Sequence, residues 1–217
     1  NAMEKKILSK LVKPTINKIA KYIPGDSKII GEKKVIKLSS NESPFKVPKN
    51  ILSFSSKLIK SINTYPDGDC LLLKTSISEK FRIKKNQIIC GNGSDDILSI
   101  IAQAFGRENS EIICSQYGFV YYPIISKVSG SKVVTAKANG MNISLENILR
   151  KISKKTKIIF FANPNNPTGT VIFKNELVSF LKKVPKNIIV VIDGAYSEFI
   201  TDSKYTDGIN LVNKFPN

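Results

Sequence analysis

Three polar residues with different chemistry follow two neighbouring apolar runs of the chain. Asn166 lies in the segment ANPNNPTG, and Asp193 and Tyr196 lie in the segment DGAY. The apolar runs before these segments, Lys157–Phe161 and Asn187–Ile192, are typical of buried parallel strands. Ligands of open parallel sheets bind just beyond the carboxyl ends of the strands. The sequence therefore predicts that an amide, a carboxylate and a phenol meet in one crevice.

A glycine-rich loop, GNGSDD, is a second candidate site and precedes an apolar helical pattern that runs to Phe105. Gly93, Ser94 and Asp95 stand where this helix is expected to begin. Free backbone N–H groups and the positive end of a helix dipole favour a phosphate at such a position. Ser94 and Asp95 are also common N-cap residues, so the loop by itself is equally typical of an ordinary helix start.

The composition argues against metal and histidine chemistry. The 217 residues contain no histidine and three cysteines, Cys70, Cys90 and Cys114, which are widely spaced and form no Cys-x-x-Cys pair. A zinc site or a catalytic device based on histidine is therefore not expected. An odd number of cysteines and the lack of a secretory signal favour unpaired, buried thiols in a cytoplasmic protein.

The formal net charge of +17 is high enough to suggest a nucleic-acid partner. The lysines, however, are spread along the chain among Ile, Asn and Ser residues, which favours a solvated, lysine-rich surface. The sequence also has no apolar run of the length that spans a bilayer. We therefore expect no nucleic-acid partner and no membrane partner. An electrostatic nucleic-acid binder would instead show a steep salt dependence of binding.

Strands and helices alternate along the chain in a way that positions the polar residues. Besides the two runs above, the sequence predicts strands at Val35–Leu38, Glu111–Ser115 and Lys132–Ala136, and helices at Leu71–Phe81, Ser144–Ile152 (with Ser144 as its cap) and Asn175–Lys183. Such alternation specifies an α/β fold with a mostly parallel sheet covered by helices. We expect an N-terminal arm with part of a small domain at residues 1–45 and a large domain at residues 46–217.

The order of these motifs resembles a known family. The pattern Asn-Pro-x-Asn-Pro-Thr-Gly, followed by Asp-x-x-Tyr at the next strand end, is similar to the fold-type-I aminotransferases that depend on pyridoxal 5′-phosphate (PLP). The remaining motifs resemble the histidinol-phosphate aminotransferase-like branch, from about Lys37 to the last residue. The resemblance implies PLP as the cofactor, a PLP-binding large domain and a homodimer as the functional unit.

The resemblance also assigns roles around the PLP ring. It implies that Asp193 pairs with the ring nitrogen and keeps it protonated, which makes the ring electron-withdrawing. It implies that Asn166 and Tyr196 hydrogen-bond the phenolic oxygen of the ring. Tyr117 matches the aromatic residue that lies flat against the pyridine ring, although Ser115-Gln116 replaces the Pro-Thr that usually precedes it.

Two further contacts to the cofactor phosphate are implied by the resemblance. Gly93, Ser94 and Asp95 match the phosphate cup, in which the backbone N–H groups of Ser94 and Asp95 hold the anion. Tyr65, in the turn TYPDG, matches a tyrosine that reaches the phosphate from the neighbouring subunit. The site would then be complete only in a dimer.

A polar segment near the N-terminus, SSNESPF, resembles the family's loop that lies over the substrate. Asn41 and Glu42 are the substrate-binding candidates that this resemblance provides. Ser43 stands where the family usually has Asn, and as sequence alone the segment is equally typical of a polar turn.

The family's catalytic lysine, which forms the Schiff base with PLP, lies in a turn after the next strand. The residues up to Asn217 match the helix and turn that precede this strand, so we expect the lysine beyond Asn217. Lys214 precedes a Phe-Pro in a turn and does not match the catalytic position. The large domain is accordingly expected to be incomplete at its C-terminal end, truncated before the Schiff-base lysine.

The resemblance implies a transaminase that moves an amino group between glutamate or 2-oxoglutarate and a phosphorylated small molecule. A related PLP-dependent decarboxylase of a phosphorylated amino acid shares every motif present here and remains an alternative. A non-catalytic truncated fragment is a second alternative, because the lysine is expected outside the 217 residues.

Overall fold

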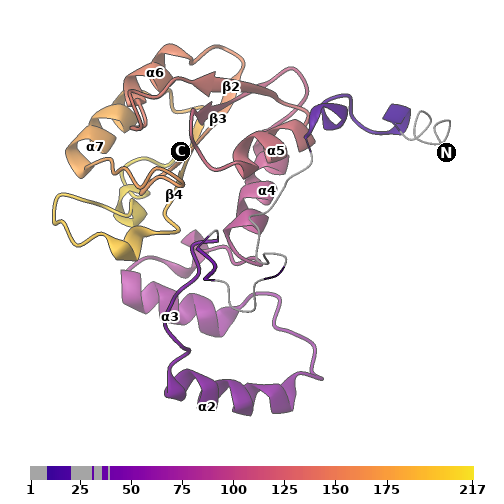
Figure 1. The fold of residues 1–217 in the computed structure, drawn as a ribbon, viewed down its shortest axis with the longest axis vertical. Coiled ribbons are helices and arrows are strands. Elements are labelled where there is room, and N and C mark those ends of the chain that lie inside the picture. Colours follow the sequence, from indigo (N-terminus) through magenta and orange to yellow (C-terminus); the bar gives the residue numbers. More distant parts are fainter. Residues whose placement is uncertain (1–8, 21–30, 32–35, 39) are drawn as a thin grey trace. The chain divides into compact units, whose positions relative to one another are not determined.

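The structure, a computed structural model, describes residues 9–20, 31, 36–38 and 40–217 (Figure 1). The chain divides into two compact units, one made of Asn1–Ile19 with Leu72–Asn217 and the other of Ala20–Leu71. The first unit contains the sheet and the strand-end segments. Among the described residues, none of the helices is both long enough and apolar enough to cross a membrane.

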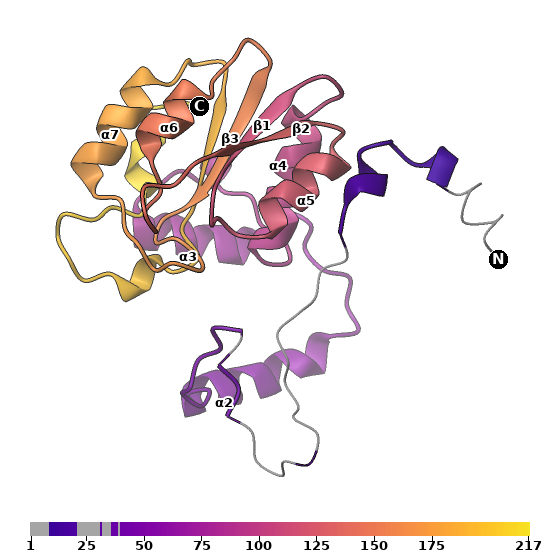
Figure 2. The same cartoon turned by 45° about the horizontal axis from the view of Figure 1, so that its top comes forward.

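The first unit is built on a sheet of four parallel strands. These are β1 (Glu111–Ser115), β2 (Lys132–Ala136), β3 (Thr156–Ala162) and β4 (Ile189–Asp193), in the order β2-β1-β3-β4 (Figure 2). The bounds of β1 and β2 agree with the predicted strands, and those of β3 and β4 differ from prediction by one or two residues at each end. The parallel sheet expected from the alternation is therefore confirmed.

The register of the sheet aligns the carboxyl ends of three strands. Cys114 near the end of β1 is paired with Phe160 of β3. Ala162 at the end of β3 is paired with Asp193 at the end of β4. Segments that follow β1, β3 and β4 consequently emerge at the same edge of the sheet, where ligands of parallel sheets bind.

Helices cover both faces of the sheet. The first face packs against α4 (Ser94–Phe105) and α5 (Tyr121–Val128), and the second against α6 (Leu145–Arg150) and α7 (Lys174–Lys183) (Figure 2). Side chains alternate along a strand, so Ile158 and Phe160 of β3 face α4 and α5. Ile159 and Phe161 face α6 and α7. This three-layer arrangement confirms the predicted fold class.

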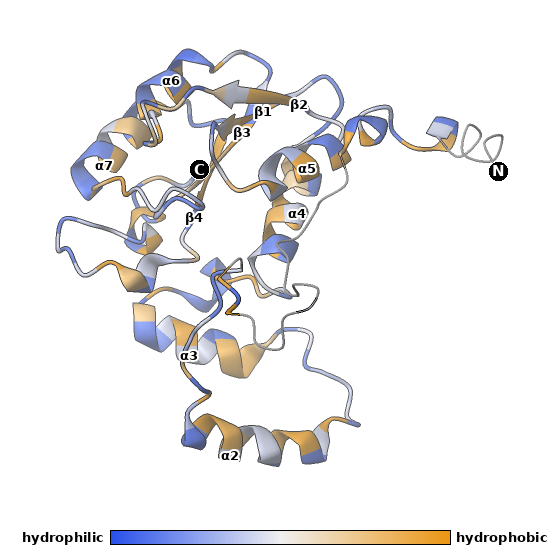
Figure 3. Cartoon of the chain, viewed as in Figure 1, coloured by the Kyte–Doolittle hydropathy of each residue, from blue (hydrophilic) through white to orange (hydrophobic). Residues whose placement is uncertain are grey.

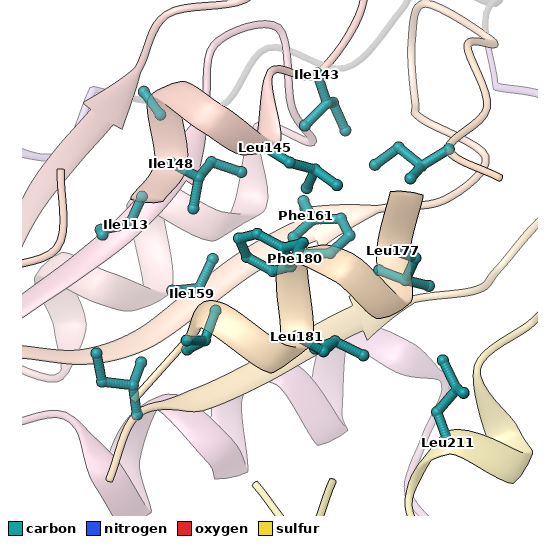
Figure 4. Close-up of a cluster of buried hydrophobic side chains, with 14 residues drawn as sticks. Ile113, Ile143, Leu145, Ile148, Ile159, Phe161, Leu177, Phe180, Leu181 and Leu211 are labelled. Atoms are coloured by element: carbon teal, nitrogen blue, oxygen red, sulfur yellow. The ribbon is translucent and has the colours of Figure 1, made fainter. Parts of the chain in front are cut away.

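The core between the sheet and the α6–α7 layer is formed by large apolar side chains (Figure 4). Phe161 of β3 and Phe180 of α7 meet edge to face, with ring centroids 5.9 Å apart and ring planes at 82°. Leu177 of α7 is fully buried beside them. Truncating a buried phenylalanine to alanine costs about 3–5 kcal/mol, so this layer contributes strongly to holding β3 in place.

Local capping signals decide where two helices begin. Ser144 precedes α6, and its Oγ accepts a hydrogen bond from the backbone N–H of Asn147 at 3.2 Å, so the predicted cap is confirmed. The N-cap of α4 is Gly93, with φ of +81°, a conformation that glycine adopts without strain. Ser94 and Asp95 therefore lie inside the first turn of α4 rather than at its cap.

The expectation that β4 is buried is wrong, because each of its residues is only half-buried. Among the described residues, β4 pairs with a single strand, β3. On the other side, Val190 donates its N–H to the carbonyl of Asn217 at 2.8 Å. The side-chain amide of Asn217 in turn donates to the carbonyl of Ile188 at 2.8 Å. The last residue of the chain thus lies along the second edge of β4.

The strand expected at Val35–Leu38 is not observed in its described part. Residues 36–38 have no regular secondary structure, and Val35 lies outside the described residues. A lone strand without a neighbour to pair with is not stable in water. The expectation of three buried thiols is also wrong, since Cys114 is buried but Cys70 and Cys90 are only half-buried.

The remaining helices are short or lie largely at the surface. Those that lie wholly within the described residues are α2 (Lys49–Leu58) and α3 (Leu71–Phe81), with single 3₁₀ turns η1 (Ile16–Lys18), η2 (Ile59–Ser61), η3 (Lys85–Gln87), η4 (Ser197–Phe199) and η5 (Ile209–Leu211). The bounds of α3 agree with the predicted helix. Neither α2 nor α3 has a buried residue, although both contain hydrophobic residues, which are coloured orange in Figure 3.

A segment near the N-terminus covers the C-terminal end of α5. Lys13 donates from Nζ to the carbonyl of Val128 at 3.3 Å, and Thr15 donates from Oγ1 to the carbonyl of Lys127 at 2.6 Å. These side chains satisfy carbonyls that lack partners within a helix. Residues 13–15 therefore belong to the first unit, while the domain boundary at residue 45 stays a prediction.

Candidate active site

The site is built where the chain leaves β3 and β4. The backbone N–H of Asn163 donates to the carbonyl of Asp193 at 2.9 Å, which extends the pairing of the two strands by one step. The hydroxyl of Tyr205 lies 2.7 Å from the carbonyl of Asn163 and 2.9 Å from Oγ of Ser197. These contacts fix the segments after β3 and β4 to each other.

The turn after β3 is held by its own side chains. Asn163 is fully buried, donates from Nδ2 to the carbonyl of Ile172 at 3.0 Å and accepts from the N–H of Ile172 at 2.8 Å. Asn165 accepts at its carbonyl from Gly169, whose φ is +69°. Both X-Pro peptide bonds of the turn are cis. The turn therefore presents the half-buried Asn166 from a well-bonded frame, as the sequence predicts.

Asp193 receives a hydrogen bond at each carboxylate oxygen. Oδ1 accepts from the backbone N–H of Ala195 at 3.1 Å, and Oδ2 accepts from the hydroxyl of Tyr122 at 2.9 Å. Tyr122 is fully buried, and its ring stacks on Phe160 with centroids 5.4 Å apart and planes 11° apart. No role is assigned to Tyr122 in the sequence analysis. Nothing in the spacing connects it to an aspartate 71 positions away.

The N-terminal turn of α4 lies close to Asp193. Burial, and then the negative charge of Asp193, raise the pKa of Asp95 above its usual value. The same carboxylates contribute to raising the pKa of Tyr122, although burial is the largest cause there. Asp95, Tyr122 and Asp193 therefore share one electrostatic environment. The first turn of α4 therefore lies within electrostatic reach of the end of β4, while the phosphate role that the resemblance implies for the glycine-rich loop stays a prediction.

The loop after β1 joins the same cluster. Tyr117 has a φ of +56°, and its carbonyl accepts a hydrogen bond from Nδ2 of Asn165 at 3.0 Å. Its side chain is 49% exposed. The next aromatic residue, Phe119, meets Tyr122 edge to face, with ring centroids 5.7 Å apart and planes at 87°. The backbone of Tyr117 and the ring of Phe119 thus contact residues of the strand-end cluster, and the sequence analysis singled out only Tyr117.

Tyr196 lies one short turn beyond Asp193 and is half-buried. Its ring approaches Phe199 at 6.4 Å between centroids, with planes at 50°. Ser197 follows it and donates from Oγ to the carbonyl of Gly194 at 2.8 Å. The segment from Gly194 to Phe199 is therefore ordered by local contacts that place Tyr196 close to the end of β4.

Two buried oxygens at this edge have no hydrogen-bond partner among the described residues. They are Oγ of Ser115, at the end of β1, and Oδ1 of Asn165, in the turn after β3. An unsatisfied buried polar atom costs about 1–3 kcal/mol. Such atoms are rare in folded proteins, and a catalytic or binding role can account for them.

Three predicted site residues lie in the second unit. Tyr65 is 97% exposed, and Asn41 and Glu42 are also exposed. Glu42 forms an ion pair with Lys37, whose Nζ lies 2.6 Å from Oε1. The structure does not test the roles that the resemblance implies for these three residues, and the roles stay predictions.

The arrangement suits a ligand with two ends of opposite charge. The first turn of α4 offers backbone N–H groups and the positive end of a helix dipole to an anion. Asp193 offers a carboxylate to a positively charged or N–H-bearing group. Among the described residues, no group of three or more His, Cys, Asp and Glu side chains is arranged to hold a metal ion.

Comparisons with known proteins agree with this geometry. The family model for aminotransferases of class I and II matches residues 33–217. The histidinol-phosphate aminotransferase of Pelagibacter ubique is 40% identical over 194 residues, covering 89% of this chain and 54% of that protein. Histidinol-phosphate aminotransferase 1 of Mannheimia succiniciproducens is 42% identical over 188 residues, covering 87% of this chain and 51% of that protein.

Solved structures show the same fold. The histidinol-phosphate aminotransferase of Clostridium acetobutylicum superposes with a TM-score of 0.71 at 28% identity, covering 82% of this chain and 52% of that one. The histidinol-phosphate aminotransferase of Sinorhizobium meliloti, in complex with pyridoxal 5′-phosphate, superposes with a TM-score of 0.74 at 22% identity. This match covers 77% of this chain and 46% of that one. The chain spans about half the length of the curated relatives it matches. By the match over residues 33–217, it belongs to the aminotransferase class I and II family.

Proposed function

We propose that this chain is part of a PLP-dependent transaminase of the histidinol-phosphate aminotransferase type. It would exchange an amino group between glutamate or 2-oxoglutarate and a phosphorylated small molecule. The observation that carries the proposal is the meeting of the segments after β1, β3 and β4 at one edge of the sheet, where the carboxylate of Asp193 accepts hydrogen bonds from Ala195 and Tyr122. Relatives named histidinol-phosphate aminotransferase, at 36–42% identity, support the substrate class.

The residues at the end of β4 and after β3 fit the ring of PLP. Asp193 would hold the ring nitrogen, because its carboxylate is fixed by two donors and each carboxylate oxygen can accept a second hydrogen bond. Asn166 and Tyr196 would donate to the phenolic oxygen. When bound, PLP withdraws electrons from the α carbon of an amine substrate and so eases loss of its proton.

The glycine-rich loop fits the phosphate of PLP. Gly93, Ser94 and Asp95 include no lysine or arginine, so the anion would be held by backbone N–H groups and the helix dipole. A β carbon added at Gly93 would meet nothing within 4 Å, so the backbone there is open on that side. The side chain of Asp95 is tolerated because its N–H, rather than its carboxylate, would face the anion.

An aromatic ring from the loop after β1 would cover the pyridine ring. Tyr117 is the residue that the family pattern assigns to this role. Phe119 is the second candidate in the same loop, favoured by its edge-to-face contact with Tyr122, which itself bonds Asp193. Stacking of either ring would orient PLP and add about 1 kcal/mol beyond its burial.

The proposal includes a homodimer in the cytoplasm, without nucleic-acid or membrane partners. Tyr65 would reach the cofactor phosphate of the neighbouring subunit, which accounts for a tyrosine that is almost fully exposed in a single chain. Asn41 and Glu42 would contact the substrate.

The proposal is tested on the protein at its natural length, purified with PLP. L-glutamate alone should convert the bound cofactor to pyridoxamine phosphate, seen as loss of its visible absorption and confirmed by mass. Histidinol phosphate with 2-oxoglutarate should then yield glutamate. Absence of any cofactor conversion would contradict the transaminase assignment and favour a non-catalytic chain, whereas release of CO₂ from a phosphorylated amino acid would identify the decarboxylase.

A further inference from the structure

Tyr122 is a buried residue of the site to which the family pattern gives no role here. Its side chain is 0% exposed, and its hydroxyl donates to Oδ2 of Asp193 at 2.9 Å from the first turn of α5. We propose that Tyr122 is a positioning residue, which fixes the Asp193 carboxylate in the orientation that receives the ring nitrogen of the cofactor. The inference rests on the proposed function, because Asp193 must contact the cofactor.

The ring of Tyr122 is held by aromatic contacts of two kinds. Phe160 of β3 stacks on it at 5.4 Å and 11°, and Phe119 contacts it edge on at 5.7 Å and 87°. A tyrosine has only two rotatable side-chain bonds, so packing of this kind leaves its hydroxyl little freedom. The hydroxyl is therefore a fixed donor rather than a mobile one.

The hydroxyl of Tyr122 also keeps its proton. Burial, followed by the negative charge of Asp193 and the hydrogen bond itself, raises the pKa of this phenol far above its ordinary value. A phenol that stays protonated donates at every pH at which the protein is folded. Asp193 therefore always receives this hydrogen bond.

The geometry around Asp193 explains why the hydroxyl of Tyr122 matters for the orientation of the carboxylate. Ala195 supplies an N–H to Oδ1 at 3.1 Å, and Tyr122 supplies an O–H to Oδ2, so the carboxylate plane is set from both sides. Hydrogen bonds to an ionised carboxylate are the strong and short ones. Without the hydroxyl of Tyr122, the carboxylate would keep a single backbone donor and could rotate away from the cofactor.

The test compares two tyrosines that are neighbours in sequence. Tyr122→Phe removes the hydroxyl and keeps the stacked ring. Tyr121→Phe is the matched control, because the hydroxyl of Tyr121 lies 2.7 Å from Oγ of Ser99 instead. In the natural-length protein, Tyr122→Phe should raise the PLP dissociation constant roughly ten- to hundredfold and weaken the circular dichroism of the bound cofactor. Tyr121→Phe should change neither the dissociation constant nor the circular dichroism. Both variants should unfold at a temperature near that of the unmodified protein.

A double-mutant cycle separates this inference from the proposed function. In an Asp193→Ala background, Tyr122→Phe should weaken PLP binding no further, because the group through which it acts is gone. Equal effects of Tyr122→Phe in both backgrounds, or an effect no larger than that of Tyr121→Phe, would overturn the positioning role and leave the proposed function intact. Unchanged PLP affinity in Asp193→Ala would overturn both. If Asp193→Ala does not fold, Asp193→Asn replaces it as the background of the cycle.

Discussion

The groups beneath the site keep their protons because of where they are buried. Cys114 of β1 is 4% exposed, and burial raises the pKa of its thiol to about 12, while Ser126 lies 4.0 Å from the sulfur and lowers it slightly. Tyr122 lies in the same core cluster. Individual residues of this layer therefore stay neutral, and the charge at the strand ends is concentrated on Asp193 and Asp95.

The buried thiol predicts a specific loss of stability at high pH. The pKa of the Cys114 thiol is 9.0 when unfolded and about 12 when folded. The contribution of the protonated thiol to the free energy of unfolding is therefore fully present below pH 9 and is lost as the pH rises from 9 to 12. Between pH 8 and pH 10, the free energy of unfolding of the unmodified protein should fall by about 1 kcal/mol more than that of Cys114→Ala.

Urea unfolding followed by circular dichroism at both pH values measures this difference. The variant is the control for the many lysines, which titrate in both proteins. Parallel pH profiles for the two proteins would contradict the raised pKa, because the thiol of the unmodified protein would then ionise equally in both states.

At the scale of elements, the turn after β3 behaves as a small rigid unit. Asn163 exchanges two hydrogen bonds with the backbone of Ile172, and its own backbone N–H is bonded to Asp193. Asn165 then links the turn to the carbonyl of Tyr117. The turn therefore connects the segments that follow all three site strands, and a defect in it is expected to affect both stability and the site.

Asn163→Ala should lower the free energy of unfolding by roughly 2–6 kcal/mol, because it leaves two buried backbone groups of Ile172 without partners at about 1–3 kcal/mol each. PLP affinity should fall as well, since Asn166 would lose its frame. Chemical denaturation and PLP titration measure the two effects. Asn175→Ala, at an exposed position in the first turn of α7, should change neither. Equal behaviour of the two variants would show that the side chain of Asn163 does not support the turn.

At the scale of the whole molecule, the proposed site needs residues from two subunits. Asp193 and the N-terminus of α4 belong to the first compact unit of the chain. Tyr65 lies at an exposed position in the second compact unit. Assembly of a homodimer is therefore the step proposed to complete the cofactor pocket.

Mixing two defective variants tests this assembly. Tyr65→Phe and Asp193→Ala homodimers should each bind PLP poorly. After unfolding and refolding together in equal amounts, each mixed dimer would contain one site with both native residues, so about a quarter of all sites should regain normal affinity. Refolding each variant alone is the control. No recovery in the mixture would show that Tyr65 does not act on the neighbouring subunit.

Sequence reasoning was most successful where local pattern and burial agree. β3 is buried except at Lys157 and β1 is buried except at Glu111, and both were predicted as strands. Ser144 was predicted as a cap from its position before α6. It failed at Val35–Leu38, where an apolar run has no strand to pair with in its described part. It predicted β4 as a strand but wrongly as a buried one, since β4 pairs with a single strand among the described residues and its residues are half-buried.

The sequence by itself determined the order of the strands and helices, the segments that follow the strands and, through the resemblance that these motifs carry, the family. These features depend on short-range pattern, which sequence retains. Only the tertiary structure decided that Tyr122 bonds Asp193, that Gly93 caps α4, and that the carbonyl of Tyr117 receives Asn165. Two of these contacts join residues 71 and 48 positions apart. Such pairings follow from the register of a parallel sheet, because the register determines which strand ends are neighbours. No local sequence pattern encodes that register.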